Sequence, residues 1–379
     1  MHKRYTYFDN ASTTMLFDNL ISEFYSLEKK YFANSSSSHE LGKLALNEIE
    51  CSRRLIADIF KTKEDNIYFV SGASEANNTI ISAALNLGIR TIITSALEHP
   101  SILEPIKYLV KYNDFNIFYV NNDTNGLLDY NHLEQLLTKH KNEKCLVSIM
   151  HANNEIGNLN NIQCISKLCK DNNALFHSDI VQTAGYYDIF PEELKIDFMS
   201  LSAHKFHGPK HVGAMYINSK INIIPLIKGG KQEMGMRAGT QSASTILLMA
   251  KALEQIYSNK STYNNYILGL YNHCLNRLSN ELKNVSINGN ASNSLHKILN
   301  ISISGKQSTE SLLINLDTNN ICVSSGSACS SGALEPSHVL KAINYNSENA
   351  NIRISFSINN TISEVDYFIE TLKSIYNEI

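Results

Sequence analysis

The sequence is poor in the features that mark several common classes of protein. Only 6 of its 379 residues are proline, and no stretch approaches the ~18 consecutive apolar residues of a membrane span. Lys and Arg number 33 against 36 Asp and Glu, which leaves a net charge of -3 and no basic stripe for a phosphate backbone. We therefore expect a globular protein that binds neither nucleic acid nor a membrane.

Cysteine pairs of the CxxC type, the strongest sequence sign of a structural zinc site, are also absent. The 7 cysteines are an odd number, scattered over a long chain without a secretory signal. This distribution argues against a disulfide framework and favours reduced thiols. We expect a cytoplasmic protein without a metal site.

Helix and strand patterns alternate from about residue 40 to 260. Apolar residues at helical spacing over residues 41–60 precede a short buried strand at 67–70. The alternation predicts an α/β fold with a largely parallel sheet, helices on both faces and a pocket beyond the carboxyl ends of the strands. The further strands expected in this part are 91–94, 116–120, 145–150, 174–177, 198–201 and 212–217.

The remaining residues predict a second, smaller α/β domain. A helical pattern over 267–278 is followed by strands at 298–303 and 352–357, and a final helix starts at a possible capping box of Thr361 and Glu364. We expect a large domain over residues 15–260 and a small domain that is formed by residues 261–379 together with residues 1–14 and carries Cys329 and Arg353.

The segment 70–78 combines a strand end, a turn of small residues and a helix. Its backbone N–H groups and the Ser74 hydroxyl could hold a phosphate at the helix N-terminus. A Ser at this position also simply caps many helices. Because neither GxGxxG nor a Walker P-loop is present, dinucleotide and ATP sites lose their main support.

Asp179 and Lys205 follow two neighbouring predicted strands, so both are expected at the same crevice. An acid that pairs with a pyridine nitrogen and a lysine that forms a Schiff base are the two protein groups that pyridoxal phosphate (PLP) chemistry requires. The structural alternative is an ion pair between the two residues. A metal alternative uses His204, His207 and His211, but Gly208 and Pro209 would interrupt a helix that aligned them.

Cys329 lies in a run of small residues, 323–332, that follows a strand end. Such a segment is sterically open, which suits a thiol that must reach a substrate and then present itself elsewhere. A buried free cysteine is the structural alternative, but Gly and Ser neighbours bury little apolar surface.

Many segments resemble, in order along the chain, the motifs of the cysteine desulfurases of the class V aminotransferase family. The Cys329 loop resembles the NifS/IscS-like group in particular, whereas the chain has Asn34-Ser35 where the family usually has Asn-Pro. The matching segments are 8–14, 71–75, Glu98-His99, 151–157, Asp179 with Gln182, 202–210, Gln232-Glu233, 237–240, the Cys329 loop, 334–340 and Arg353.

This resemblance implies a PLP-dependent transferase of fold type I, like aspartate aminotransferase, that acts as a homodimer. Lys205, Cys329 and His99 then match the catalytic residues, and Arg353, Asn34 and Asn154 match residues that bind the substrate. A planar guanidinium suits a substrate carboxylate. The matching cofactor-binding residues are Ala73, Ser74, His99, Asn154, Asp179, Gln182, Ser202, His204, Lys205 and, from the other subunit, Thr240.

The activity that the resemblance implies is conversion of L-cysteine to L-alanine, with sulfur left as a persulfide on Cys329. His99 is expected to carry a proton, because imidazole titrates near neutrality. The sulfur would pass to an acceptor protein such as an iron–sulfur scaffold, or to transfer-RNA thiolation. Selenocysteine lyase is the alternative activity. A class V aminotransferase needs no thiol, and a degenerate scaffold protein would not need this set of residues.

Overall fold

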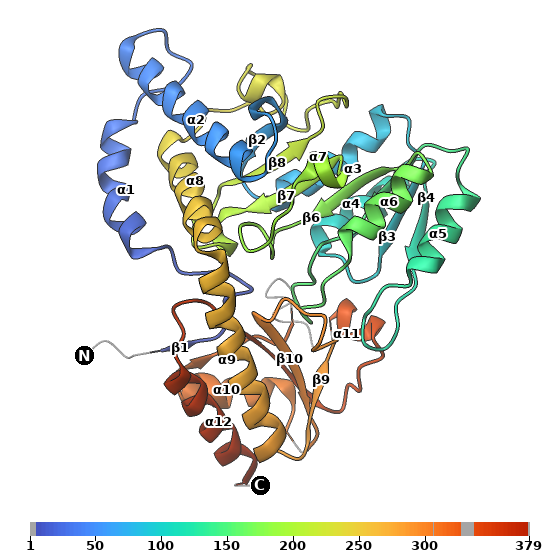
Figure 1. The fold of residues 1–379 in the computed structure, drawn as a ribbon, viewed down its shortest axis with the longest axis vertical. Coiled ribbons are helices and arrows are strands. Elements are labelled where there is room, and N and C mark those ends of the chain that lie inside the picture. Colours follow the sequence, from blue (N-terminus) through green and yellow to red (C-terminus); the bar gives the residue numbers. More distant parts are fainter. Residues whose placement is uncertain (1–4, 306, 327–336, 378–379) are drawn as a thin grey trace.

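The computed structural model describes residues 5–305, 307–326 and 337–377. Its centre is a seven-stranded sheet in the order β2-β8-β7-β6-β5-β3-β4 (Figure 1). Strand β8 runs antiparallel to both of its neighbours, and the other pairs are parallel. The predicted, largely parallel sheet is thus confirmed. Its strands are β2 (Ile67–Val70), β3 (Thr91–Ser95), β4 (Asn116–Val120), β5 (Cys145–Ser148), β6 (Leu175–Asp179), β7 (Phe198–Ser202) and β8 (Gly213–Ile217).

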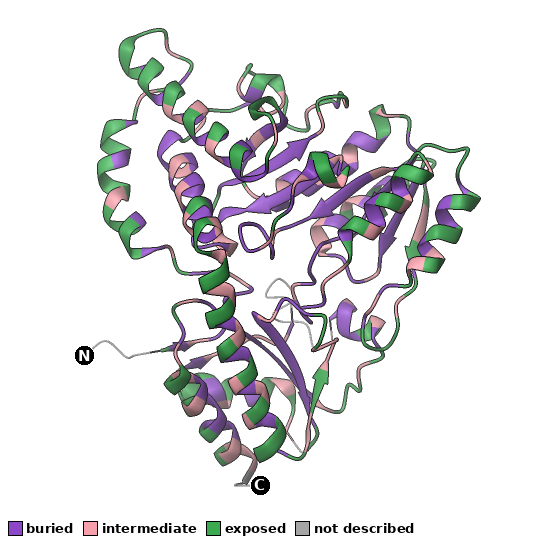
Figure 2. Cartoon of the chain, viewed as in Figure 1, coloured by how far each residue is buried: buried purple, intermediate pink, exposed green. Residues whose placement is uncertain are grey.

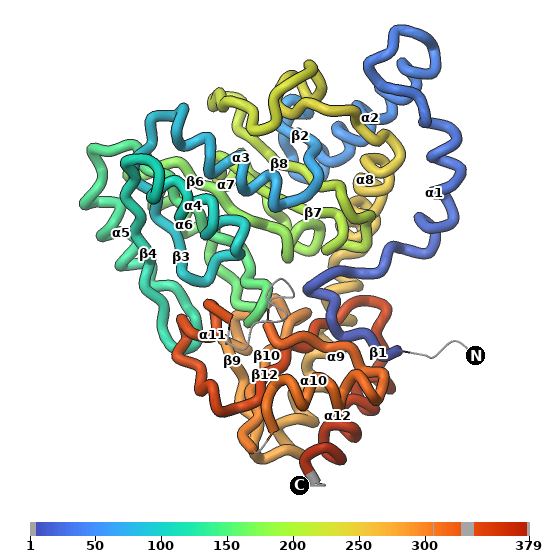
Figure 3. The backbone as a smooth tube through the Cα atoms, turned by 180° about the vertical axis from the view of Figure 1, so that it is seen from behind, coloured from blue at the N-terminus to red at the C-terminus, as the bar shows by residue number. Residues whose placement is uncertain are grey.

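Both faces of this sheet are covered, because successive strand residues point to opposite sides. Ile92, Leu146 and Phe198 pack in one apolar cluster, and the next residue of each strand packs in another. Helices α3 (Ala73–Asn86) and α4 (Pro100–Tyr112) cover the first face, which Figure 3 shows from behind. The opposite face is covered by α2 (Glu40–Ile59), α5 (Tyr130–Lys139), α6 (Ile162–Asp171) and α8 (Ala243–Ser258).

Shorter elements complete this part of the molecule, which we call the large lobe (residues 15–258). Figure 2 shows its strands as mostly buried, except for the edge strand β4, and the outer surfaces of its helices as exposed. The remaining elements are α1 (Asp18–Lys30), α7 (Pro191–Leu194) and the 3-10 helices η1 (Glu64–Asn66), η2 (Ala203–Lys205) and η3 (Glu233–Gly235).

The small lobe (residues 5–14 and 260–377) contains an antiparallel sheet in the order β12-β10-β9 and a parallel pair of β1 with β11. The long helix α9 leads into it and lies beside α12 (Figure 1). The division at residues 260 and 261 stays a prediction. The elements are β1 (Thr6–Tyr7), α9 (Lys260–Glu281), β9 (Val285–Asn288), β10 (Ile298–Ile303), α10 (Thr309–Thr318), β11 (Ile321–Cys322), α11 (His338–Ala342), β12 (Ala350–Ser355) and α12 (Ile362–Asn377).

The predicted capping box of the last helix is confirmed. The Thr361 N–H donates to Glu364 Oε2 at 2.8 Å, and the Glu364 N–H donates to Thr361 Oγ1 at 3.3 Å. Two backbone donors that the helix leaves without partners are thereby satisfied. No helix of the described residues is long and apolar enough to cross a membrane.

Candidate active site

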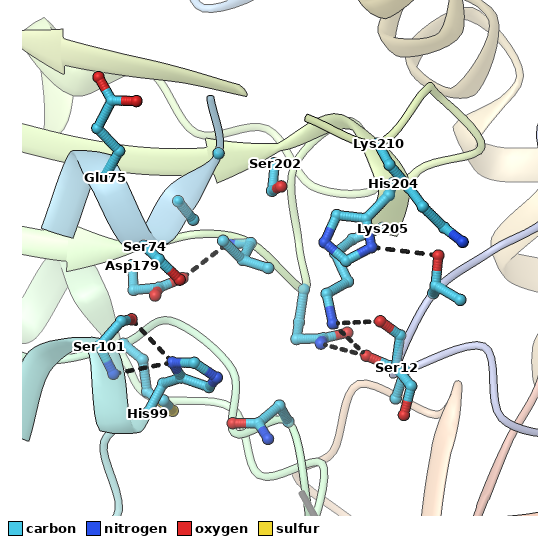
Figure 4. Close-up of a pocket in the computed structure, with 18 of the residues that line it drawn as sticks. Ser12, Ser74, Glu75, His99, Ser101, Asp179, Ser202, His204, Lys205 and Lys210 are labelled. Carbon is cyan, nitrogen blue, oxygen red and sulfur yellow. Dashed lines mark hydrogen bonds between the residues drawn. The ribbon is translucent and has the colours of Figure 1, made fainter. Parts of the chain in front are cut away.

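A cavity of about 440 Å³ lies where the carboxyl ends of the parallel strands meet the small lobe. Asp179 ends β6, Ser202 ends β7, and Ala73 and His99 stand at the starts of α3 and α4. Figure 4 shows His99, Asp179 and Lys205 around the same space. The predicted residues that line it are Ala73, Ser74, His99, Asn154, Asp179, Gln182, Ser202, His204, Lys205 and Arg353.

Lys205 reaches the cavity from the 3-10 turn η2, directly after β7. Its Nζ donates to the carbonyl oxygens of Ala11 and Ser12 at 2.7 and 2.8 Å. The charge of Lys205 also acts on Asp179, whose pKa it lowers, so the structural alternative of an ion pair stays open. The Lys205 amine faces the cavity, where an aldehyde could meet it.

Asp179 is 7% exposed and held in one orientation. Asn77 Nδ2 donates to Asp179 Oδ2 at 2.8 Å, and the Val181 N–H donates to Oδ1 at 2.9 Å. Burial raises the pKa of the Asp179 carboxyl, and these two hydrogen bonds and the nearby Lys205 offset the rise in part. A cationic ring nitrogen in the cavity would supply the partner that such a buried carboxylate needs.

His99 is held by the first turn of α4. Its Nδ1 accepts the Ser101 N–H at 3.1 Å and lies 2.8 Å from Ser101 Oγ. Burial, and after it the charges of Lys205 and His338, lowers the pKa of His99 to about 4. Burial therefore favours the neutral His99 ring, whereas the sequence predicted an imidazole that titrates near neutrality; its role as a proton carrier stays a prediction.

One end of the cavity is suited to a phosphate group. The N-terminus of α3 points towards it, and its first turn supplies backbone N–H groups at Ala73 and Ser74. Gly72 precedes this turn with φ of +157°, and a methyl group added to it would lie 3.4 Å from Ser202 Oγ. His204, on the neighbouring turn, lies with Nδ1 3.2 Å from Thr13 Oγ1.

Gln182 and Asn154 place amide groups at the cavity between these two regions. Gln182 Nε2 donates to the Ala11 carbonyl at 3.1 Å, whereas its buried Oε1 has no partner within the described part of the chain. A buried polar atom without a partner is costly unless a ligand satisfies it. The Gln182 side chain is therefore arranged for a polar group that the cavity would receive.

Arg353 lies on β12 and is 1% exposed. Its Nη1 donates to the Asn154 carbonyl at 2.8 Å, and its Nη2 bonds Ser12 Oγ at 2.6 Å and Asp9 Oδ1 at 2.8 Å. Arg353 Nε is buried without a partner among the described residues. The guanidinium is thus fixed at the cavity wall with donor capacity remaining.

Two of the predicted site residues are not brought to this cavity. Asn34 and Thr240 are exposed and do not line it, and Asn34 Oδ1 accepts the Ser36 N–H at 2.9 Å. Cys329 lies outside the described residues. The three histidines of the metal alternative are not brought together either. His207 is buried with Nδ1 2.8 Å from the Met15 carbonyl, whereas His211 is exposed at the cavity.

Other residues line the cavity that the sequence did not single out individually. They include Ser101, Met150, Val181 and Lys210. Ser101 and Val181 each lie two residues after a predicted site residue, in the segment that follows a strand, which is the signal that could have found them. The positions of the Lys210 and His211 side chains depend on a turn in which His211 has φ of +61°.

These features fit PLP. A lysine at the cavity, a buried carboxylate, an orphaned amide oxygen and a helix N-terminus correspond to its aldehyde, ring nitrogen, ring oxygen and phosphate. With the fold, they define a PLP-dependent enzyme of fold type I. The aminotransferase class-V family model matches residues 6–368, and the chain belongs to that family.

Similar proteins carry names that are more specific than the family description. A cysteine desulfurase IscS of Dictyoglomus turgidum is 39% identical over 382 residues, covering 100% of this chain and 96% of the relative. A solved NifS-like protein is 33% identical with a TM-score of 0.91, covering 99% and 100% of the two chains. A structure titled SspA in complex with cysteine is 29% identical with a TM-score of 0.81, covering 94% and 99%.

Proposed function

We propose that this chain is a PLP-dependent cysteine desulfurase that converts L-cysteine to L-alanine and keeps the sulfur as a persulfide on Cys329. The observation that carries the proposal is one cavity that joins Lys205 and Asp179 with the fixed guanidinium of Arg353. The cysteine desulfurase names of full-length relatives support it. When bound, PLP stores the electrons that leave the substrate's α-carbon.

The cofactor would be held by residues of the large lobe. Lys205 would bind it covalently, and Asp179 would pair with its ring nitrogen. Asn154 and Gln182 would contact the ring oxygen, and the neutral His99 ring would lie against the cofactor ring. The phosphate would be bound by Ala73, Ser74, Ser202 and His204, with Thr240 supplied by a second copy of the chain.

Arg353 would bind the substrate carboxylate, with Asn154 beside it, and Asn34 is a further predicted contact. The Lys205 amine would take the α-proton of the substrate, because it lies at the place in the cavity where the cofactor would hold the substrate. The Cys329 thiolate attacks the substrate sulfur, an S–S bond forms and the C–S bond breaks. The bonding electrons of the C–S bond stay on the three-carbon fragment, which takes up protons and leaves as alanine.

A second copy of the chain completes the proposed site. Thr240 is exposed, and the loop before it carries Ile224 and Met234, which are 54% and 52% exposed. Apolar exposure beside an unused predicted ligand supports a homodimer. Light scattering should give twice 42.5 kDa, and Thr240→Val should weaken PLP binding without dissociating the dimer. A monomer that binds PLP as tightly as a dimer contradicts this part of the proposal.

The proposed destination of the sulfur is an acceptor protein, such as an iron–sulfur scaffold, and the proposed location is the cytoplasm, where thiols stay reduced. The activity itself is tested by incubating the purified protein with PLP, L-cysteine and a reductant. Alanine and sulfide should appear in equal amounts, and L-serine, which lacks sulfur, should give neither. Absence of alanine would contradict the proposed function.

A further inference from the structure

A buried carboxyl group stands next to the cavity and has none of the roles described above. Glu155 is 1% exposed and directly follows Asn154, which lines the cavity. Asn153 Oδ1 accepts the Glu155 N–H at 2.8 Å, and Asn300 Nδ2 donates to the Glu155 carbonyl at 3.1 Å. The Glu155 side chain therefore starts from a backbone that is fixed by contacts to both lobes.

The Glu155 carboxylate is bonded to one end of the segment that carries Cys329 and lies close to the other. Ser337, the first described residue after it, donates from Oγ to Glu155 Oε2 at 2.5 Å. Gly326 is the last described residue before it, and a methyl group added there would lie 3.1 Å from the same oxygen and 3.5 Å from Ser337 Cβ. Gly326 has φ of +128°, which L side chains rarely adopt, so the close approach and the backbone both require glycine.

The two ends are also tied to the cavity wall. Ser324 Oγ donates to the Gly326 carbonyl at 3.1 Å, and Ser324 exchanges two backbone hydrogen bonds with Arg353 at 2.5 and 3.2 Å. At the other end, His338 Nε2 lies 2.7 Å from the carbonyl oxygen of Glu98, the residue before the cavity imidazole. Each end is thus close in the chain to a residue that is bonded to the cavity wall.

Chain geometry makes the position of these ends important for the thiol. Cys329 follows Gly326 by three residues and precedes Ser337 by eight residues in the sequence. The positions of Gly326 and Ser337 therefore limit where the chain between them can place the thiol. A reacting group misplaced by ~1 Å can slow a reaction about 100-fold.

We propose that Glu155 is a positioning residue for sulfur transfer, whose carboxylate holds both ends of the Cys329 segment against the cavity wall through Ser337 and Gly326. The proposal rests on the proposed desulfurase function. Glu155 Oε1 is buried without a partner among the described residues, a cost that an apolar side chain would avoid. Burial also raises the pKa of Glu155, which Ser337, His338 and Arg353 offset only in part.

Three serine variants test this role without removing the carboxylate. Ser337→Ala deletes the hydroxyl that bonds Glu155, and Ser337→Thr keeps a hydroxyl at that place. Ser337 also caps α11, because its Oγ accepts the Leu340 N–H at 3.2 Å. The matched control is Ser308→Ala, which removes the cap of α10 in the same lobe, where Ser308 Oγ accepts the Ser311 N–H at 3.2 Å.

Two rates are measured on the dimeric holoenzyme in a single turnover with L-cysteine. The first is the change in cofactor absorbance, which does not need Cys329, and the second is the appearance of persulfide on Cys329 by mass spectrometry. Ser337→Ala should slow the second rate at least about tenfold and leave the first within about twofold. Ser337→Thr and Ser308→Ala should leave both rates within about twofold.

A Glu155→Ala variant and its combination with Ser337→Ala complete the test. If the hydroxyl acts through the carboxylate, the double variant should form persulfide no more slowly than Glu155→Ala alone. Persulfide formation at the wild-type rate in Ser337→Ala, or equal slowing of both rates, overturns the positioning role. A wild-type protein that forms no persulfide overturns the proposed function itself, which separates the two failures.

Discussion

The Arg353 guanidinium and the Asp9 carboxylate form an ion pair, with Nη2 2.8 Å from Oδ1. The pair joins β12 to the segment after β1, close to the carbonyl groups that accept from Lys205. The proposed substrate-binding Arg353 and the proposed cofactor-binding Lys205 are thus both bonded to the same backbone segment, residues 9–12. Substitution of Arg353 should therefore affect substrate binding, and substitution of Lys205 should affect cofactor binding.

Arg353→Lys should raise KM for L-cysteine at least about tenfold and leave PLP affinity within about twofold. An ammonium cannot keep the contacts to Asn154 and Asp9 and also present a planar fork to a carboxylate. Steady-state kinetics and PLP titration measure the two effects. Arg277→Lys, on the surface of the small lobe, is the control, and an unchanged KM in Arg353→Lys would remove Arg353 from the substrate site.

Lys205→Ala should abolish alanine formation, because it removes both the covalent attachment of the cofactor and the base that takes the α-proton. Absorbance spectra should show loss of the protein-bound cofactor band, and dialysis should remove PLP. The exposed Lys220→Ala is the control. A Lys205→Ala enzyme with near wild-type turnover would refute this assignment.

Asp179→Ala should still bind PLP but turn over at least about 100-fold more slowly, because the cofactor ring loses the anion that keeps it protonated. The cofactor spectrum should shift as well. Asp197→Asn is the matched control, since Asp197 is a largely buried carboxylate that accepts the Phe176 N–H at 3.0 Å at the opposite end of the strands. Normal turnover with an unchanged spectrum would contradict the role of Asp179.

Cys329→Ser should keep PLP bound and respond spectroscopically to L-cysteine, yet form neither alanine nor persulfide. A hydroxyl does not ionise near neutrality, so it cannot attack the substrate sulfur. Mass spectrometry of the wild type, treated with cysteine without reductant, should place the extra sulfur on the peptide that contains Cys329. Sulfur found on Cys322 would show that the mechanism is wrong even though the fold is right.

His177→Asn should flatten the pH dependence of stability. His177 is fully buried between Ser148 and Ser200, and burial lowers its pKa to about 3. Between pH 3 and 6.5 the unfolded chain binds a proton at His177 that the folded chain does not bind. The free energy of unfolding of the wild type therefore falls by up to about 1.4 kcal/mol per pH unit on acidification.

Urea unfolding between pH 5 and 7.5 measures this effect. At pH 7.5 the His177→Asn variant should be about 1–3 kcal/mol less stable, because hydrogen bonds in the sheet are lost. The difference should narrow as the pH falls. The control is the exposed His39→Asn, and parallel stability curves for wild type and His177→Asn would argue against a depressed pKa.

The strands of the large lobe were predictable because their signals are local. The predicted strands at 67–70 and 116–120 match β2 and β4, since both are short runs of mainly apolar, aromatic and β-branched residues. Strands β1 and β9 were not predicted. β1 has two residues whose partner β11 lies more than 300 residues away, and the middle of β9 is exposed on an edge.

The candidate site, like the fold, was predictable from the sequence only in part. The amino-acid sequence by itself predicted Lys205, Asp179 and Arg353 as site residues from recognisable motifs, and all three line one cavity. Only the tertiary structure decided that Lys205 Nζ donates to the Ala11 carbonyl, that burial lowers the pKa of His99, and that Ser337 donates to Glu155. These outcomes depend on desolvation and on contacts between residues far apart in the chain, which no local pattern contains.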